Sequence, residues 1–378
     1  MSQNKIESSL NETRRFEPPE RFVSNSQLTI QSLARLKQKA LDDYEKFWAD
    51  LAHQEIQWFT PCTETLDESQ APNYTWFADG KLNASYNCLD VNVNKNPGKI
   101  AVIFEGENGD VRTLTYADLL IEVCRLSNGL LSLGVKPLDR VIIYMPMVPE
   151  AIIAMQACAR IGAVHSVVFG GFSAKAMRDR IEDAEASLVI TADGGYRGGQ
   201  VIPLKESTDK ALQENCASVK HVVVLRRTEH KIPMRQDRDI WWHDLVDGQN
   251  ETCEATPVSS EHPLFILYTS GSTGKPKGIQ HSTAGYLLGA KLTNKWVFDL
   301  AQDDIFWCTA DVGWITGHSY VAYGPLAAGT TIMIYEGAPT YPDGGRFWEI
   351  CQRHTISIFY TAPTAIRALM RLGDALPN

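Results

Sequence analysis

Several features that would place a protein in a familiar class are missing from this sequence of 378 residues. The most apolar stretch, residues 141–171, is interrupted by prolines and charged side chains, so it lacks the ~20 uninterrupted apolar residues of a membrane-spanning helix. The net charge is −9, which disfavours an extended nucleic-acid footprint. The polar N-terminus, Met1 to Asn11, has no apolar signal-peptide core. We therefore expect a cytoplasmic protein without nucleic-acid or membrane partners.

Metal-binding and disulfide patterns are also missing. The eight cysteines are scattered and form no C-x-x-C pair, and the nine histidines show no H-x-x-x-H spacing. No protein-held metal is therefore expected. Cys124, Cys158 and Cys308 stand inside apolar runs, which favours small buried thiols in a reducing compartment; a zinc site or a disulfide framework is the alternative.

The first 98 residues predict an extension that precedes the main domains. Residues 1–25 are polar and indicate a loose arm. Apolar side chains from Leu33 to Leu51 recur at spacings of three and four, which predicts one face of a single amphipathic helix. Residues 52–98 contain many turn formers, and we expect an irregular segment that packs on the surface of the next domain.

From about residue 99 the pattern alternates between strands and helices. Thr115 and Asp118 form a capping box before a helical stripe that ends near Gly134. Further helices are predicted to begin at Pro149 and after Ser173. The predicted strands cover residues 141–144, 164–169, 188–191, 221–225, 264–269, 331–335 and 356–360.

This order predicts an α/β fold of two stacked αβ subdomains, with mainly parallel sheets covered by helices. We divide the chain into a helical and irregular extension (1–98), a first αβ subdomain (99–260) and a second (261–378). No internal repeat or low-complexity tract interrupts this plan.

The most informative stretch is the loop Tyr268-Thr-Ser-Gly-Ser-Thr-Gly-Lys-Pro-Lys-Gly278, which directly follows a predicted strand. Its glycines let the backbone approach an anion, its hydroxyls and amides can donate hydrogen bonds, and Lys275 and Lys277 can neutralise charge. A flexible surface turn is the alternative. The combination favours a loop that binds a polyphosphate.

Other phosphate-binding and hydrolase motifs do not fit. A Walker A loop needs G-x-x-x-x-G-K-[ST], whereas Gly271 and Gly274 are three apart and Pro276 replaces the hydroxyl residue. The sequence contains no G-x-G-x-x-G fingerprint, no G-x-S-x-G elbow and no paired-carboxylate arrangement. His281, shortly after the loop, is better explained by packing than by catalysis.

At residues 269–278 the sequence resembles the acyl-adenylate-forming superfamily. Four further blocks narrow the resemblance to the family of AMP-forming acetyl-coenzyme A synthetases, of which the chain resembles the N-terminal part. These blocks are residues 241–245, 308–314, 316–320 and 360–365. The resemblance implies a two-step ligase: ATP and acetate give acetyl-AMP and pyrophosphate, and coenzyme A then displaces AMP. It implies ATP, coenzyme A and acetate as small-molecule partners, with Mg²⁺ carried on ATP.

The resemblance also assigns roles to individual residues. In the family the loop closes over the β- and γ-phosphates of ATP, and we predict Thr269 and Lys275 as catalytic residues. The predicted phosphate ligands are Thr269, Ser270, Gly271, Ser272, Thr273, Gly274, Lys275 and Lys277. The residues that match the family's acyl pocket are Trp314, Ile315 and Thr316, although a lone tryptophan is also explained as a core residue.

The loop at residues 193–200 places glycines around Arg197, which suits a phosphate or adenine contact, or a surface turn with a solvated arginine. In the family this loop contacts coenzyme A, often through two arginines three apart. Here Gln200 stands at the second position, and Thr340 stands where the family often has asparagine. The predicted coenzyme A contacts are Arg197, Gly198, Gly199, Gln200, Thr316 and Thr340.

The family's adenine and ribose motifs, hinge and C-terminal domain with its catalytic lysine do not occur before Asn378. We therefore expect a truncated chain without the C-terminal domain, which binds nucleotide weakly and is inactive alone. Enzymes that acylate or deacylate lysine would act on the absent part. The alternatives are a propionyl-CoA synthetase, which tends to carry valine in place of Thr316, and a non-catalytic nucleotide-binding or interaction fragment.

Overall fold

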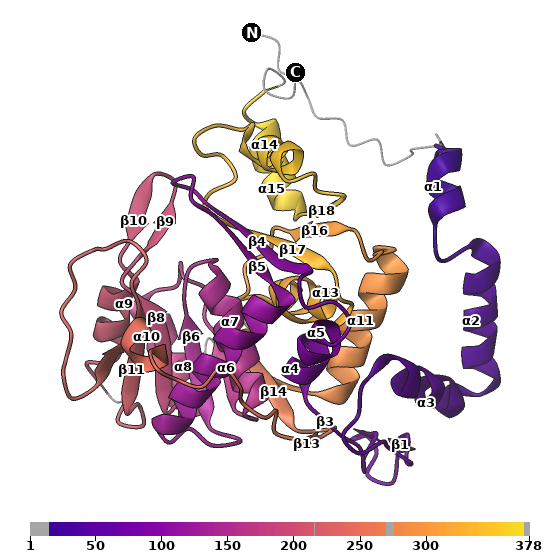
Figure 1. The fold of residues 1–378 in the computed structure, drawn as a ribbon, viewed down its shortest axis with the longest axis horizontal. Coiled ribbons are helices and arrows are strands. Elements are labelled where there is room, and N and C mark those ends of the chain that lie inside the picture. Colours follow the sequence, from indigo (N-terminus) through magenta and orange to yellow (C-terminus); the bar gives the residue numbers. More distant parts are fainter. Residues whose placement is uncertain (1–14, 215, 270–275, 374–378) are drawn as a thin grey trace.

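The computed structural model describes residues 15–214, 216–269 and 276–373. Two β-sheets form the centre of the molecule, with helices packed against both faces of each sheet (Figure 1). Helices from the N-terminal part of the chain run along one side of this body (Figure 1). The arrangement confirms the predicted α/β class, with mainly parallel sheets and a helical N-terminal extension.

The first sheet has seven strands in the order β12-β11-β8-β6-β7-β14-β15. Neighbouring strands are parallel, except for the antiparallel pair β14–β15 at one edge. The strands are β6 Arg140–Tyr144, β7 Val164–Val167, β8 Leu188–Ala192, β11 His221–Leu225, β12 Asp239–Trp241, β14 Pro263–Thr269 and β15 Lys277–Ser282. Continuous apolar runs such as Val222–Val224 form buried strands because helices cover both faces of the sheet.

The second sheet has five strands in the order β18-β16-β17-β4-β5. Only β4 and β5 pair in the antiparallel direction. The strands are β4 Ile100–Gly106, β5 Val111–Thr115, β16 Ile305–Cys308, β17 Thr331–Glu336 and β18 Ile358–Tyr360. All six residues of β17 are buried, so this strand lies at the centre of its sheet.

Successive residues of one strand face different cores, which shows how the layers are built. Val141 and Ile143 of β6 belong to the largest apolar core, between the two sheets, whereas Ile142 and Tyr144 face a second core. A third core lies on the outer face of the five-stranded sheet. The inner layer contains α6 Tyr116–Ser132, α7 Pro149–Arg160, α11 Ala284–Val297 and α13 Gly324–Ala327. The outer faces are covered by α8 Ala174–Ala184, α9 Leu204–Ala211 and α14 Arg346–Arg353.

Two helix caps predicted from the sequence are present. The Thr115 hydroxyl accepts a hydrogen bond from Asp118 N, and the Asp118 carboxylate accepts one from Thr115 N, which completes the capping box. Ser173 caps α8 by accepting from Ala176 N. The main body also contains α10 Trp242–Val246, the short α12 Ile315–Gly317, the π-helix η1 His318–Tyr323 and α15 Pro363–Met370.

The N-terminal extension contains two helices where one was predicted. The chain forms α2 Ile30–Asp42 and α3 Tyr44–Glu55, because the Asp43 side chain accepts a hydrogen bond from Lys46 N and caps the second helix. The prediction of a single helix was therefore wrong. The remaining elements of the extension are α1 Glu20–Asn25, β1 Leu66–Asp67, β2 Thr75–Trp76, β3 Lys81–Leu82, α4 Ala84–Cys88 and α5 Asp90–Val93.

The chain contributes strands first to the five-stranded sheet, then to the seven-stranded sheet, and then again to the five-stranded sheet. β4 and β5 precede the first strand of the seven-stranded sheet in sequence, but they belong to the five-stranded sheet. The predicted domain boundaries at residues 98 and 260 remain predictions, and a division at these positions would separate β4 and β5 from the other strands of their sheet. Within the described residues, no helix is both long and apolar enough to cross a lipid bilayer.

Candidate active site

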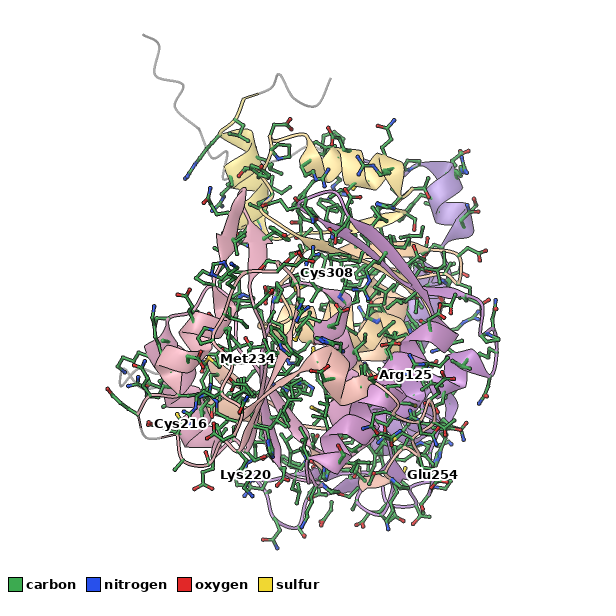
Figure 2. The ribbon with its side chains drawn as sticks, turned by 60° about the vertical axis from the view of Figure 1, so that its left-hand side comes forward. Arg125, Cys216, Lys220, Met234, Glu254 and Cys308 are labelled. Carbon is green, nitrogen blue, oxygen red and sulfur yellow. The ribbon has the colours of Figure 1, made fainter. Side chains whose placement is uncertain are left out.

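The segments that follow the carboxyl ends of both sheets meet one another. After β16, Val312 N lies 3.3 Å from Met147 Sδ, in the segment that follows β6. After β8, Tyr196 N donates to a carboxylate oxygen of Glu336, at the end of β17, at 3.0 Å. Ligands of open α/β sheets bind outside the carboxyl ends of the strands. Figure 2 shows Cys308, the last residue of β16, near the middle of the view.

The predicted phosphate loop joins β14 to β15, and Thr269 pairs with Lys277 across this hairpin. Both residues are exposed. Residues 270–275, which include the predicted catalytic residue Lys275, lie outside the described part of the chain. Because β14 is parallel to β7, Thr269 lies at the same edge of the sheet as the segment that follows β7. The strand β15 was not predicted.

Arg180 links this hairpin to the predicted acyl pocket, and sequence reasoning missed it. Its guanidinium lies over the Tyr268 ring at 5.4 Å and over the Phe172 ring at 4.8 Å. Burial lowers the pKa of Arg180. Phe172 in turn contacts Trp314, with ring centroids 6.0 Å apart. Arg180 lies on α8, and its spacing in sequence gave no signal of this contact.

The predicted acyl-pocket residues lie at a helix start beside β7. Trp314 is 50% exposed and Ile315 is 44% exposed, and Ile315 begins the short helix α12 Ile315–Gly317. The Trp314 ring lies 6.1 Å from Phe169, just beyond β7. Gly317 is required by close packing, because a Cβ there would lie 2.1 Å from the Asp311 carbonyl oxygen. The exposed tryptophan is a surface residue rather than part of the core.

Asp311 precedes the predicted acyl-pocket residues in sequence and lies near Arg197 of the predicted coenzyme loop. Burial raises the pKa of its carboxyl to about 6, although a hydrogen bond from Gly313 N and the charge of Arg197 act to lower it. The Gly313 N to Asp311 Oδ1 distance is 2.7 Å. A carboxyl group whose pKa is raised by burial is typical of functional sites.

Five of the six predicted coenzyme residues, from two segments far apart in sequence, lie close together. Arg197 and Gln200 pair across the hairpin of β9 Gly195–Arg197 and β10 Gln200–Ile202. A Cβ on Gly199 would lie 2.8 Å from the Tyr341 ring, beside the exposed Thr340. The backbone amides of Gly198 and Gly199, however, donate to the Glu107 carboxylate at 2.7 and 2.8 Å. These amides therefore already bind an anion of the protein itself.

Next to the predicted acyl-pocket residues lies a stack of buried aromatic and histidine rings. The His318 and His165 centroids are 5.4 Å apart, and Phe265 lies 4.4 Å from His318. Burial lowers the pKa of His318 to about 3. His318 begins the π-helix η1 His318–Tyr323, a form common near functional sites. His281 stacks on Phe265 at 4.5 Å, which agrees with a packing role.

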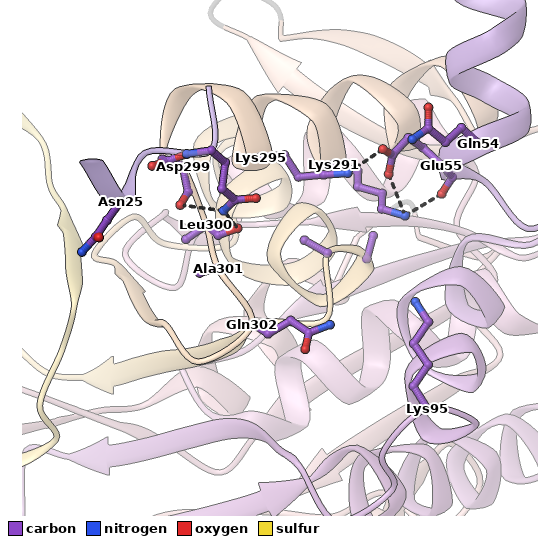
Figure 3. Close-up of a pocket in the computed structure, with 13 residues that line it drawn as sticks. Asn25, Gln54, Glu55, Lys95, Lys291, Lys295, Asp299, Leu300, Ala301 and Gln302 are labelled. Carbon is purple, nitrogen blue, oxygen red and sulfur yellow. Dashed lines mark hydrogen bonds and ion pairs between the residues drawn. The ribbon is translucent and has the colours of Figure 1, made fainter. Parts of the chain in front are cut away.

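A cavity of about 500 Å³ lies elsewhere, between the N-terminal extension and α11 (Figure 3). Its lining includes Lys95, Lys291, Lys295 and Glu55, but none of the predicted site residues. Lys295 and Lys291 both form ion pairs with Glu55, at 2.5 and 3.3 Å. The two lysines therefore join α11 to α3. In the part of the chain that the structure describes, no group of three or more His, Cys, Asp or Glu side chains could hold a metal ion.

The sequence that forms these two sheets and the loops at their carboxyl ends matches a known family. A family model described as AMP-binding enzyme matches residues 89–377, and one described as acetyl-coenzyme A synthetase N-terminus matches residues 33–88. The chain belongs to the AMP-binding enzyme family.

Individual relatives narrow this further. The chain is 60% identical to the acetyl-coenzyme A synthetase of Methylobacillus flagellatus over 375 residues, which are 99% of this chain and 57% of the relative. It is 58% identical to that of Chromobacterium violaceum, with the same coverage, and 60% identical to that of Thiobacillus denitrificans, over 98% of this chain and 57% of the relative. The chain therefore spans a little over half the length of the curated relatives it matches.

Proposed function

We propose that this chain is the substrate-binding part of an AMP-forming acetate–CoA ligase. The observation that carries the proposal is the meeting of the β14–β15 hairpin, the segment around Trp314 and the β9–β10 hairpin at the carboxyl ends of two mainly parallel sheets. The printed names of the relatives, acetyl-coenzyme A synthetase, supply the substrate class. Cytoplasmic location is part of the proposal, and the eight free cysteines support it.

The reaction needs no nucleophile from the protein. An acetate oxygen attacks the α-phosphorus of ATP, the bond from that phosphorus to the bridging oxygen breaks, and pyrophosphate leaves. The sulfur of coenzyme A then attacks the acetyl carbon of acetyl-AMP, the bond from carbon to the phosphate oxygen breaks, AMP leaves, and the thiol proton passes to solvent. The protein contributes positioning and neutralisation of charge.

Each group of residues has a proposed role. The loop from Thr269 to Lys277, with Lys275 at its centre, binds the departing pyrophosphate. Mg²⁺ reaches the site on the triphosphate, since hard cations prefer phosphate and carboxylate oxygens. Trp314, Ile315 and Thr316 line the acetate pocket, and Arg197 and Thr340 contact coenzyme A. By itself we expect the chain to bind nucleotide weakly, because it spans only 57% of the length of the Methylobacillus flagellatus relative.

The test is a chimera in which this chain replaces the matching part of the Methylobacillus flagellatus synthetase. We expect acetate-dependent exchange of pyrophosphate into ATP, and acetyl-CoA formation when coenzyme A is added. The unaltered relative is the positive control, and omission of acetate is the negative control. A folded chimera that shows no acetate-dependent exchange would contradict the proposed function.

A further inference from the structure

One glutamate forms hydrogen bonds with two of the three segments that carry the predicted coenzyme contacts, the β9–β10 turn and the segment before Thr340. Glu107 follows β4 in the five-stranded sheet and is only 9% exposed. Its carboxylate accepts hydrogen bonds from three backbone N–H groups: Gly198 at 2.7 Å, Gly199 at 2.8 Å and Ala338 at 2.8 Å. These donors lie 91, 92 and 231 residues away in the sequence.

The geometry makes the three amides a specific partner for this carboxylate. Gly198 and Gly199 both have positive φ, +62° and +72°, a conformation in which consecutive amides point to one side and form an anion-binding concavity. Hydrogen bonds to an ionised carboxylate are roughly twice as strong as neutral ones. In the described part of the chain Glu107 forms no ion pair with a lysine or arginine, so the amides are its main partners.

The rest of the hairpin is tethered by a second acidic side chain. Glu336 accepts from Tyr196 N on one carboxylate oxygen and binds Arg227 on the other at 2.8 Å. This contact holds the start of β9, whereas Glu107 holds the turn between β9 and β10. A two-stranded hairpin is only marginally stable without such support. Arg197 and Gln200 flank this turn and are exposed.

We infer that Glu107 is a positioning residue for coenzyme A: it fixes the Gly198–Gly199 turn against Ala338, so that Arg197 and Thr340 face the same side of the site. The inference rests on the proposed function, since it assumes that this surface receives coenzyme A. Glu107 contacts no reacting atom and acts only through the turn and the Ala338 segment.

A competing role would give the opposite result. The three amides would also suit a phosphate, and a carboxylate that merely occupies a phosphate position would compete with coenzyme A. Removal of an anchor weakens coenzyme binding, whereas removal of a competitor strengthens it. The sign of the change in coenzyme affinity therefore decides between the two roles.

The experiment uses Glu107→Ala and Glu107→Gln in the chimera. Glu254→Gln, at an exposed glutamate labelled near the lower edge of Figure 2, is the matched control. We expect the KM for coenzyme A to rise roughly tenfold for the alanine variant and less for glutamine, which keeps one acceptor oxygen. Acetate-dependent pyrophosphate exchange, which needs no coenzyme A, should keep its KM for ATP in all three variants.

Hydrogen exchange on the 378-residue chain gives a readout that does not depend on activity. The amides of Gly198, Gly199 and Ala338 should exchange faster in Glu107→Ala than in the parent, and Glu254→Gln should leave them unchanged. An unchanged or lowered KM for coenzyme A would overturn the inference. Loss of acetate-dependent pyrophosphate exchange in the parent chimera would instead overturn the proposed function. Faster hydrogen exchange of the three amides in Glu107→Ala would still show that Glu107 holds the turn.

Discussion

Two hairpins at the carboxyl edge of the seven-stranded sheet are held in different ways. The β9–β10 hairpin is tethered by carboxylates of the protein: Glu107 binds its turn and Glu336 binds its first strand. The described ends of the β14–β15 loop, Thr269 and Lys277, are exposed, and Lys277 forms no ion pair with any described residue. The β9–β10 hairpin is thus already held by carboxylates of the protein, whereas the ammonium group of Lys277, at the end of the β14–β15 loop, is available to an external anion.

The largest expected effect is a loss of folding stability in Arg227→Met, because Arg227 pairs with one of the carboxylates that hold the β9–β10 hairpin. Arg227 binds Glu336, which is 2% exposed, and Asp110, and burial raises the pKa of Glu336 although Arg227 acts to lower it. Removal of one partner leaves a buried carboxylate unpaired, which costs about 3 kcal/mol of unfolding free energy. Chemical denaturation of the chain measures this loss.

The neighbouring Arg226 is the matched control, since it is exposed and stacks on Trp241. Arg226→Met should change the stability by less than about 1 kcal/mol. Addition of Glu336→Gln to Arg227→Met should restore part of the loss, because it removes the unpaired charge. Equal losses of stability for the two arginine variants would show that the ion pairs of Arg227 do not support the β9–β10 hairpin.

A smaller effect on stability, dependent on pH, is expected at Asp311, whose carboxyl is influenced by the charge of Arg197 in the β9–β10 hairpin. Its folded-state pKa, about 6, lies above the ordinary value of 3.8. The folded protein therefore binds more protons between these values than the unfolded chain, and this contribution to stability is present at low pH and is lost as the pH rises through about 6.

Asp311→Asn removes the titration and keeps an oxygen that can accept from Gly313 N. The parent should lose stability relative to this variant between about pH 4 and pH 6, by at most about 3 kcal/mol. Denaturation curves of both chains over this pH range provide the measurement. A difference that does not change with pH would mean that Asp311 is not desolvated.

Much of the fold could be predicted because local patterns determine it. The apolar runs of β6, β8 and β11 and the caps at Thr115 and Ser173 all formed where the sequence placed them. The break at Asp43 was missed because the apolar spacing continues through it while its side chain caps the next helix. The spacing of apolar residues identifies one face of a helix, but it carries no information about a polar side chain that caps the next helix.

The site was harder to predict, for a physical reason. The blocks around Lys275, Arg197 and Trp314 stood out because unusual residues are adjacent in sequence. The residues that support these blocks do not stand out in the sequence. Glu107 contacts Ala338, which is 231 residues away, and Arg180 contacts Tyr268 only because α8 packs on the sheet. The acidic residues just after the apolar strand β4 were the only sequence signal of the Glu107 anchor.

The central claim is that the loop between β14 and β15 binds the outer phosphates of ATP. Its most direct test is acetate-dependent pyrophosphate exchange by the chimera that carries Thr273→Ala and Lys275→Ala, with Lys175→Ala as an exposed lysine control. We predict a loss of at least roughly a hundredfold for the double variant, as for removal of a charge-stabilising group, and no loss for the control. Exchange by the double variant within about twofold of the parent chimera would contradict the account.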